Sequence, residues 1–552
     1  MGAWFRSGDP WIWLIGGGLA ISLVMVVGLF LLIAVRGFSH FWPAPLVETT
    51  LTVDGESTRV LGVVTQTETL PAARVRESGV DLPAEQEFVT RHLLKVGNRD
   101  LTGRDFVWYL DEQLDEWTYP DNAMRVERRE WGDFYGYPLA LEQAGEVVAE
   151  GEGLWPELQQ AIERAEDLHH RIRRLEKVDI GAVNRALEAI RLDRRRLEFQ
   201  DVRGPELVRA EAEFERREAE LDRQFAGIRE ERGVLMEEIE RDVLVAETAS
   251  GAEVRIPLAD IVMASKNNAL GFIGKLDFYL ERIVDFLTGY PREANTEGGI
   301  FPAIFGTVIM VLIMSVLVTP FGVLAAIYLR EYAKQGTILR IIRVSVYNLA
   351  GVPSIVFGVF GLGFFVYLLG GTIDDLFYPE RLPAPTFGTP GLFWASLTLA
   401  LLTLPVVIVS TEEGLARIPR TIREGSLALG ATKWETLWKV VVPLSAPAMM
   451  TGLILAVARA AGEVAPLMLV GVVKLAPSLP VDGEFPYVHL ERKIMHLGFH
   501  IYDVGFQSPN VEAARPLVYA TALTLVLLIL VLNLTAIAIR NRLREKYRAE
   551  SD

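Results

Sequence analysis

The hydrophobic positions of this chain gather in six long stretches, one near the start and five in the second half. Each is long enough for a helix that crosses a bilayer, which takes about 20 apolar residues. The stretches are Trp11–Val35, Phe301–Tyr328, Val344–Leu369, Leu392–Ser410, Ala446–Val470 and Leu517–Ile539. The first is too long for the apolar region of a signal peptide, which indicates a retained anchor. The pattern predicts a polytopic α-helical membrane protein with six transmembrane helices.

The polar stretch between the first two spans predicts an inserted α+β domain. Residues 48–150 contain short β-like runs that Gly, Pro and Asp separate. Residues 157–246 carry apolar positions at helical spacing, and Gly204-Pro205 suits a turn between two arms. In the second arm the apolar residues recur every seven positions, at Leu207, Phe214, Leu221, Ile228 and Leu235. This part is therefore expected to be an antiparallel helical hairpin with coiled-coil packing.

Two further features of the insert follow from its pattern. Val243–Ala246 and Glu253–Ile256 are expected to be strands that return to the β region, so the hairpin is an insertion within one domain. Gly271–Leu287 is expected to be an amphipathic helix near the membrane surface. The charged hairpin is either a solvated spacer or a docking arm for an external partner, and charge at helical spacing favours the spacer.

The charges of the short loops predict the orientation. Lys and Arg cluster in residues 329–343, in residues 411–444 and in the C-terminal tail, which lie on one side of the six spans. The opposite loop, 370–391, carries Arg381 against three carboxylates. Because basic short loops remain in the cytoplasm, both termini are expected inside and the insert outside.

This orientation divides the chain into five expected regions of a multi-pass protein of the bacterial inner (plasma) membrane. They are a cytoplasmic N-terminus at 1–10, an anchor helix at 11–35, an external (periplasmic) domain at 36–299, a five-span permease core at 300–540 and a cytoplasmic tail at 541–552.

Composition narrows the class of function. The net charge of −16 makes the chain a poor partner for nucleic acid, which proteins bind by neutralising phosphates with Lys and Arg. The lack of cysteines excludes disulfides and thiolate metal sites. The phosphate-binding pattern G-x-x-x-x-G-K-[ST] does not occur either. We therefore expect no cofactor and no ATP hydrolysis by this chain itself. We expect the apolar spans to contact membrane lipid.

The polar loop Glu424–Pro443 lies between two predicted spans and has the composition of a short helix, with glycines at positions 425 and 430. Such a loop suits a permease that binds an ATPase from the cytoplasm. Its spacing resembles the coupling loop of ABC importer permeases, which is E-A-A, three residues, Gly, nine residues and I-x-L-P. The matching positions are Glu424, Gly430, Val440, Val442 and Pro443. Gly425-Ser426 replaces the two alanines of the pattern.

A second candidate site is the pair Arg459 and Glu463, which the pattern places in the middle of the fifth span. An ionisable residue at membrane depth indicates function by default. The two residues are four apart, so they can pair on one helical face, and Arg is suited to contact an oxyanion in transit. The alternative is a structural pair that holds two helices together.

Three histidines occur in the loop before the last span, at His489, His496 and His500. The last two have helical spacing, which would allow metal ligation. We expect plain surface polar groups instead, because histidines in a loop are most often of that kind. The predicted sites therefore include no metal site and no catalytic residue.

Several runs in the second half resemble the phosphate importer permeases of the ABC type. Asn348–Gly358 resembles the signature of their third span, and Glu297–Thr307 resembles the start of their core. Gly462–Leu467 and Leu329–Ala333 resemble the A-type subunit (PstA), although Val464 replaces a threonine. The resemblance covers about 295–545 and extends weakly into the insert through Gly97–Leu101. The C-type subunit (PstC) is similar enough to remain an alternative.

The resemblance implies the type I fold of ABC importer permeases and a set of partners. These are a PstC-type permease as the second half of a heterodimer, two copies of the ATPase PstB, and a periplasmic phosphate-binding protein. The expected function is ATP-driven import of inorganic phosphate. The alternatives are import of another oxyanion, such as sulfate or molybdate, or a membrane-anchored sensor or scaffold.

Overall fold

The computed structural model describes residues 9–53, 56–77, 86–483, 485–508 and 511–549. Residues 1–8 of the expected N-terminal region and residues 550–552 of the expected tail lie outside the described residues. The chain forms two compact units. One comprises Met1–Phe41 with Val284–Asp552 and is called the membrane unit here; the other is Trp42–Ile283 and is called the insert unit. Each is described by itself.

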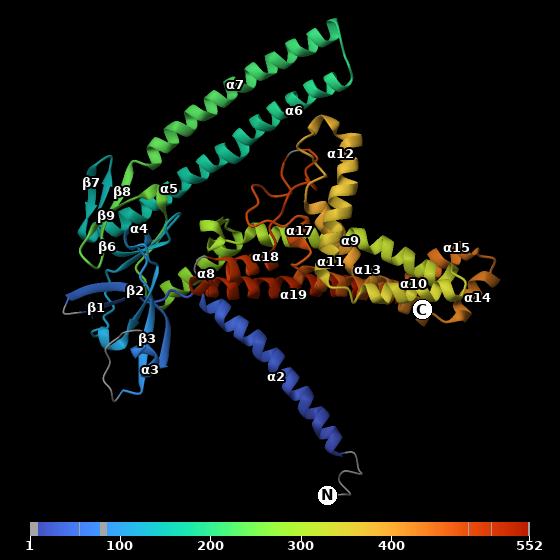
Figure 1. Ribbon diagram of the computed structural model, residues 1–552, viewed down its shortest axis with the longest axis horizontal. Coiled ribbons are helices and arrows are strands. Elements are labelled where there is room, and N and C mark those ends of the chain that lie inside the picture. Colours follow the sequence, from blue (N-terminus) through green and yellow to red (C-terminus); the bar gives the residue numbers. More distant parts are fainter. Residues whose placement is uncertain (1–8, 54–55, 78–85, 484, 509–510, 550–552) are drawn as a thin grey trace. The chain divides into compact units, whose positions relative to one another are not determined.

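The insert unit contains two main antiparallel sheets (Figure 1). The first has the order β1 (Val47–Val53), β2 (Glu56–Pro71), β3 (Phe88–Lys95) and β4 (Phe106–Leu110). The second has the order β10 (Ile261–Ser265), β5 (Met124–Arg128), β6 (Asp133–Gln143), β8 (Asp242–Glu247) and β9 (Glu253–Pro257), with β7 (Glu146–Glu150) also paired to β6. The predicted β region is confirmed, and so are the two strands predicted after the hairpin.

A buried polar cluster joins the two sheets. Asn98 has a left-handed backbone (φ 53°), and its amide donates to the carbonyl of Tyr135 and accepts from the Tyr135 N–H. Asp133 receives Lys95 Nζ at 2.6 Å and Arg125 Nε at 3.1 Å. Burial alone would raise the pKa of Asp133, but the two cations outweigh it and hold the pKa below its usual range. The run Gly97–Leu101 therefore has a structural role.

The predicted helical hairpin is confirmed. Its first arm is α5 (Leu154–Arg174), a π-helical turn at Leu175–Asp179 and α6 (Ile180–Phe199). Its second arm is α7 (Pro205–Ile239), which lies beside α6 and runs in the opposite direction (Figure 1). The heptad positions of α7 are all buried or half-buried.

Ion pairs connect the arms of the hairpin along their length. Arg194 contacts Glu211 at 3.1 Å and Glu218 at 3.2 Å, and Arg232 contacts Glu176 at 2.7 Å. At the base, α5 and the end of α7 pack on the second sheet around Leu158, which is fully buried. The charges therefore pair within the hairpin, as the spacer interpretation expects.

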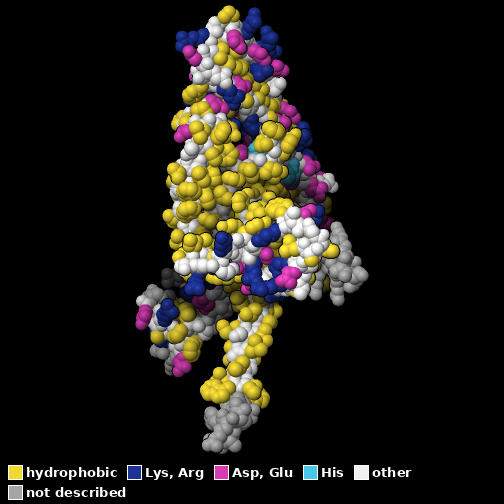
Figure 2. All heavy atoms as spheres, turned by 90° about the vertical axis from the view of Figure 1, so that its right-hand side faces the viewer, with side chains coloured by type: hydrophobic (Ala, Val, Ile, Leu, Met, Phe, Trp, Pro, Cys, Tyr) yellow, Lys and Arg dark blue, Asp and Glu magenta, His cyan; other side chains and the backbone are white. Residues whose placement is uncertain are grey.

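Among the described residues, the membrane unit contains six helices that are long and apolar enough to span a membrane. They are the helical segments Trp11–Ser39, Phe301–Tyr332, Ser354–Phe377, Leu392–Arg417, Lys433–Gly462 and Ala514–Arg542. The first belongs to α2 (Asp9–Ser39), the second to α9 (Phe301–Ile327), the fourth is α13 (Leu392–Arg417) and the sixth belongs to α19 (Val511–Ala549). α13 is the most buried span and packs against α9 and α16 (Val442–Gly462). On the outside, hydrophobic side chains cover much of the surface shown in Figure 2, as expected of helices in lipid.

The third span begins later than the prediction of Val344–Leu369. A separate helix, α10 (Thr337–Leu349), ends before Pro353, and the span runs through α11 (Ser354–Phe360), a π-helical segment and α12 (Gly371–Phe377). The reason is Pro353, which has no N–H to donate and an extended backbone (φ −54°, ψ 134°). The prediction from hydropathy alone had merged the end of α10 with the span, although Pro353 separates the two helices.

The fifth span also differs from its prediction, Ala446–Val470. Its helix extends back through Lys433 and ends at Gly462, because Glu463 has an extended conformation (φ −79°, ψ 137°). A short helix, α17 (Leu467–Val470), follows after Pro466. The prediction that Arg459 lies in the middle of a span is therefore wrong: Arg459 lies in the last turn of α16.

Candidate functional site

The candidate coupling loop, Glu424–Pro443, starts within α14 (Arg420–Ala428), where Glu424 is exposed. The helix ends at Gly430, whose φ is +89°. The Gly430 N–H donates to the carbonyl of Leu427 at 3.0 Å, and the Ala431 N–H donates to the carbonyl of Ser426 at 3.3 Å. These two bonds form a Schellman motif, which requires a left-handed residue at the position of the glycine. Gly430 is thus where the helix stops and the chain turns.

The second half of the coupling loop starts a new helix directly. Thr432 and Glu435 form a capping box, in which each side chain bonds the other residue's backbone N–H. α15 (Lys433–Thr436), a π-helical turn at Leu437–Val441 and α16 then follow without a break. The structure therefore has a short helix, α14, joined at a fixed corner to the start of the long helix that forms the fifth span.

The last three motif positions anchor the loop to the spans. Val440, Val442 and Pro443 are half-buried, and Pro443 lies where the π-helical turn passes into α16. Between them Val441 is fully buried in a small core that includes Leu415, Ile418, Ile327 and Leu437.

A polar clamp ties the loop to the end of the second span. Arg423 donates to Glu331 Oε1 at 2.8 Å and to the carbonyls of Ile418 and Leu415 at 2.7 and 2.8 Å. Lys433 Nζ donates to the carbonyl of Glu331 at 2.6 Å and lies over the ring of Tyr332. Sequence reasoning did not assign this role, although it singled out the run that contains Glu331.

The candidate coupling loop exposes large apolar side chains beside charged ones such as Lys439, whose side chain is 75% exposed. Leu429 is 91% exposed and Trp434 is 60% exposed, and Leu427 and Trp438 are exposed beside them. Large apolar side chains that gather on a short, firmly held loop mark an interaction surface.

Arg459 and Glu463 are paired in the structure, with Arg459 Nε 3.6 Å from Glu463 Oε1. Arg459 ends α16 and Glu463 is the residue that caps it, so the contact lies at a helix end. The side chains are 33% and 20% exposed in this chain. The pair is thus partly accessible, as a group that contacts a passing ion has to be.

Two of the runs that the sequence analysis singled out make close backbone contacts with loop segments of the membrane unit. Gly358 approaches Pro466 so closely that a Cβ on Gly358 would lie 2.6 Å from Pro466 Cα. Gly306 similarly approaches the carbonyl of Met495. Gly358 therefore allows the third span to contact the segment that follows Glu463, and Gly306 allows the second span to contact the loop before the last span.

We expect Gly358→Ala to lower the stability of the membrane unit by roughly 1–3 kcal/mol, the usual cost of forcing atoms into a packed site. The control is Gly363→Ala in the same span, since a Cβ there meets nothing within 4 Å. The measurement is the amount of monodisperse chain that remains after heating in detergent. Equal melting of the two variants would show that the contact with Pro466 is not tight.

The prediction for the histidines is wrong, because His489, His496 and His500 are all buried. His489 Nε2 contacts Asp482 at 2.9 Å. His496 caps α18 (Leu497–Tyr502) by accepting the Gly498 N–H at 3.1 Å. Burial lowers the pKa of His496 and of His500 to about 4, so both rings are neutral at physiological pH. The loop before the last span is therefore a packed element rather than a solvated one.

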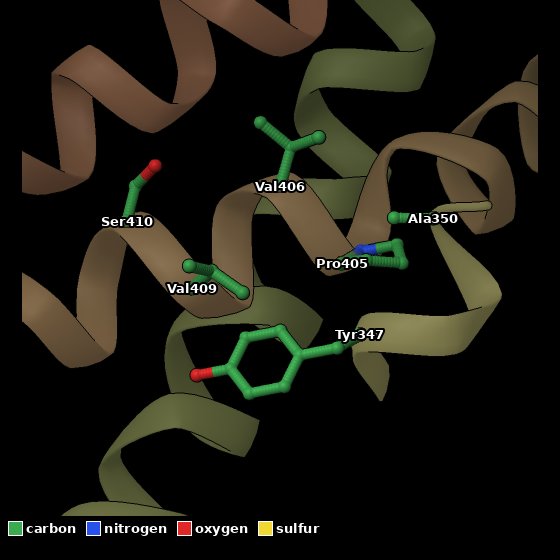
Figure 3. A pocket seen from close by; sticks show the side chains of 6 residues that line it. All are labelled: Tyr347, Ala350, Pro405, Val406, Val409 and Ser410. Carbon is green, nitrogen blue, oxygen red and sulfur yellow. The ribbon is translucent and has the colours of Figure 1, made fainter. Parts of the chain in front are cut away.

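A hollow of about 320 Å³ lies between α10 and α13. Figure 3 shows its lining, with the ring of Tyr347 beside Val409 and the hydroxyl of Ser410 at one end. The other lining residues are Ala350, Pro405 and Val406. The six side chains carry no charge, so this hollow is not suited to an anion.

Comparisons with known proteins agree with this geometry. The family model for the binding-protein-dependent transport system inner membrane component matches residues 318–548. The chain is 37% identical to phosphate transport system permease protein PstA 1 of Mycobacterium tuberculosis over 175 residues, which are 32% of this chain and 52% of that protein. It is 30% identical to probable ABC transporter permease protein YqgH of Bacillus subtilis over 220 residues, which are 39% of this chain and 67% of the relative.

A solved structure of the MetNI methionine ABC transporter is also similar, with 18% sequence identity and a TM-score of 0.33. The match covers 44% of this chain and 94% of that chain. The chain spans about half the length of the PstA 1 relative. The family model and the coverage of YqgH, together with the six apolar helices, establish that the chain belongs to the binding-protein-dependent inner membrane permeases of ABC transporters.

Proposed function

We propose that this chain is the A-type permease subunit of an ATP-driven importer of inorganic phosphate. It pairs with a C-type permease, two copies of a separate ATPase and a periplasmic phosphate-binding protein. The observation that best supports a transport function is the loop Glu424–Pro443. Its short helix and the start of the fifth span carry exposed apolar side chains, and the ion pair of Arg423 with Glu331 ties this region to the end of the second span. A sensor or scaffold would not need such a surface.

The choice of phosphate rests on the relatives. The M. tuberculosis relative bears the name of a phosphate transport permease. The Arg459–Glu463 pair fits an oxyanion, because the guanidinium contacts two oxygens and the carboxylate keeps the site near neutral, which favours release. Sulfate or molybdate would fit the same chemistry and is the second candidate.

The function is tested by purifying the tagged chain from its native membrane and by measuring uptake. We expect the ATPase to copurify and labelled phosphate to enter cells, with unlabelled phosphate competing better than sulfate or molybdate. Recovery of the ATPase with competition by sulfate alone would assign another oxyanion. A chain that brings down no ATPase and supports no uptake would be a scaffold.

The proposed orientation places the insert unit in the periplasm and the coupling loop in the cytoplasm. The side chains of Arg203 at the hairpin tip and of Lys439 in the loop Glu424–Pro443 are well exposed, at 81% and 75%. We expect Arg203→Cys, but not Lys439→Cys, to react with an impermeant maleimide from outside intact spheroplasts; lysed cells provide the control. Reaction of both from outside would contradict the six-span topology.

A further inference from the structure

Helix α8 (Phe272–Thr288) carries an exposed apolar stripe. Its members recur at intervals of three and four residues, so they lie on one face. They are Ile273 (83% exposed), Leu276 (43%), Leu280 (54%), Val284 (56%) and Leu287 (37%). A stripe this regular along a whole helix has to be covered by something apolar.

The other faces of α8 are already used. Phe278 and Phe286 are buried against the protein, and Arg282 forms an ion pair with Glu127. One flank of the stripe carries Glu281 and Asp285, which are exposed and acidic. The helix is thus sorted into a packed face, an acidic flank and an open apolar stripe.

The C-terminal end of α8 is bonded to the start of a membrane span. The Ile300 N–H donates to the carbonyl of Phe286 at 2.8 Å, and the Phe301 N–H donates to the carbonyl of Gly289 at 3.1 Å. Phe301 is the first residue of the span. The ring of Phe41, just after the first span, lies 5.1 Å from that of Phe286. Two spans therefore fix this end of α8 at the depth where they leave the lipid.

The N-terminal part of α8 carries aromatic side chains of the kind that gather at membrane interfaces. Trp42, which follows the first span closely, has its ring 6.3 Å from Phe272 and 5.8 Å from Tyr279. Trp and Tyr are enriched at the level of lipid headgroups, where one end of the ring is apolar and the other meets water.

We propose that α8 lies in the plane of the membrane and inserts its apolar stripe into lipid. The leaflet is the one at which the first span ends and the second begins. The occupant is lipid because the helix continues from the spans themselves. Since the flank is acidic, the helix is held by burial of apolar side chains rather than by attraction to anionic headgroups. This role does not depend on which ion is transported.

The absence of native cysteines makes the test direct. Single cysteines replace Ile273, Leu280 and Val284 on the stripe, and Glu281 and Asp285 on the flank, in the full-length chain in native membranes and in lipid nanodiscs. Each cysteine carries an environment-sensitive fluorophore. Quenching is measured with a phospholipid that bears a nitroxide near the top of its acyl chain, and separately with aqueous iodide.

We expect the lipid nitroxide to quench the stripe labels at least about threefold more than the flank labels, because interfacial helices bury one face just below the headgroups. Iodide should give the reverse order. Changing the fraction of anionic lipid should leave the pattern unchanged. Stripe labels that iodide quenches and the nitroxide does not would overturn the proposal. So would labels shielded from both quenchers in native membranes but not in nanodiscs, which would show that a partner protein covers the stripe.

Discussion

Gly430→Asp is expected to abolish phosphate uptake while the chain still reaches the membrane. The φ of +89° is a conformation that side chains disfavour, at a cost of order 1–3 kcal/mol for strained backbones. A Cβ on Gly430 would meet nothing within 4 Å of this chain, so the space beside it is open to the proposed partner, a separate ATPase. The new carboxylate would enter that space next to Leu429 and Trp434. The measurements are uptake of labelled phosphate and the amount of ATPase that copurifies.

A matched pair of alanines separates this effect from general damage to the helix. Gly430→Ala should lower uptake and ATPase recovery strongly. Gly425→Ala should change neither, because Gly425 lies within α14 with no atom near its Cβ position and no positive φ. Gly430→Asn should fall between the alanine variant and the native chain, since Asn tolerates the left-handed region. Normal uptake and normal ATPase recovery in Gly430→Asp would show that Glu424–Pro443 is not the binding surface.

The architecture could be predicted from the sequence wherever one physical rule dominated. Bilayer thickness makes spans such as α9 and α13 visible as apolar stretches, and heptad spacing made the hairpin visible through Phe214 and Leu235. The predicted bounds of the third and fifth spans were wrong because hydropathy contains no information on the backbone conformation that ends a helix. Pro353 separates two apolar helices, and Glu463 ends a helix inside an apolar run.

The candidate site was predictable in its motif but not in its contacts. The corner at Gly430 follows from a glycine at a helix end, which is a local signal. The clamp between Arg423 and Glu331 joins residues 92 positions apart, and spacing within a motif says nothing of such a pair. The burial of His496 and His500 was also invisible, because the loop that holds them has no periodicity from which packing could be inferred.

We expect every replacement of Arg459 to stop uptake, even when the new residue keeps part of the chemistry of arginine. Arg459→Gln removes the charge, and Arg459→Lys keeps the charge but loses the planar fork that contacts two oxygens of an oxyanion. Both should assemble with the partner subunits, because the pair with Glu463 is partly exposed at a helix end and such pairs contribute little to stability. Glu463→Gln should leave an uncompensated positive charge and slow release of the anion.

Exchanging Arg459 and Glu463 distinguishes a role of the pair in ion transport from a purely structural role. If the pair serves only to hold the end of α16, the double variant Arg459→Glu with Glu463→Arg restores the contact and therefore uptake. The exchange reverses the favourable position of a cation in the last helical turn, but that costs only about 0.3–1 kcal/mol, too little to prevent assembly. We expect assembled complex without uptake, because the guanidinium then lies beyond the helix end rather than at the height of residue 459. Uptake is normalised to the recovered complex, and full rescue by the exchange would exclude a role for Arg459 in the path of the ion.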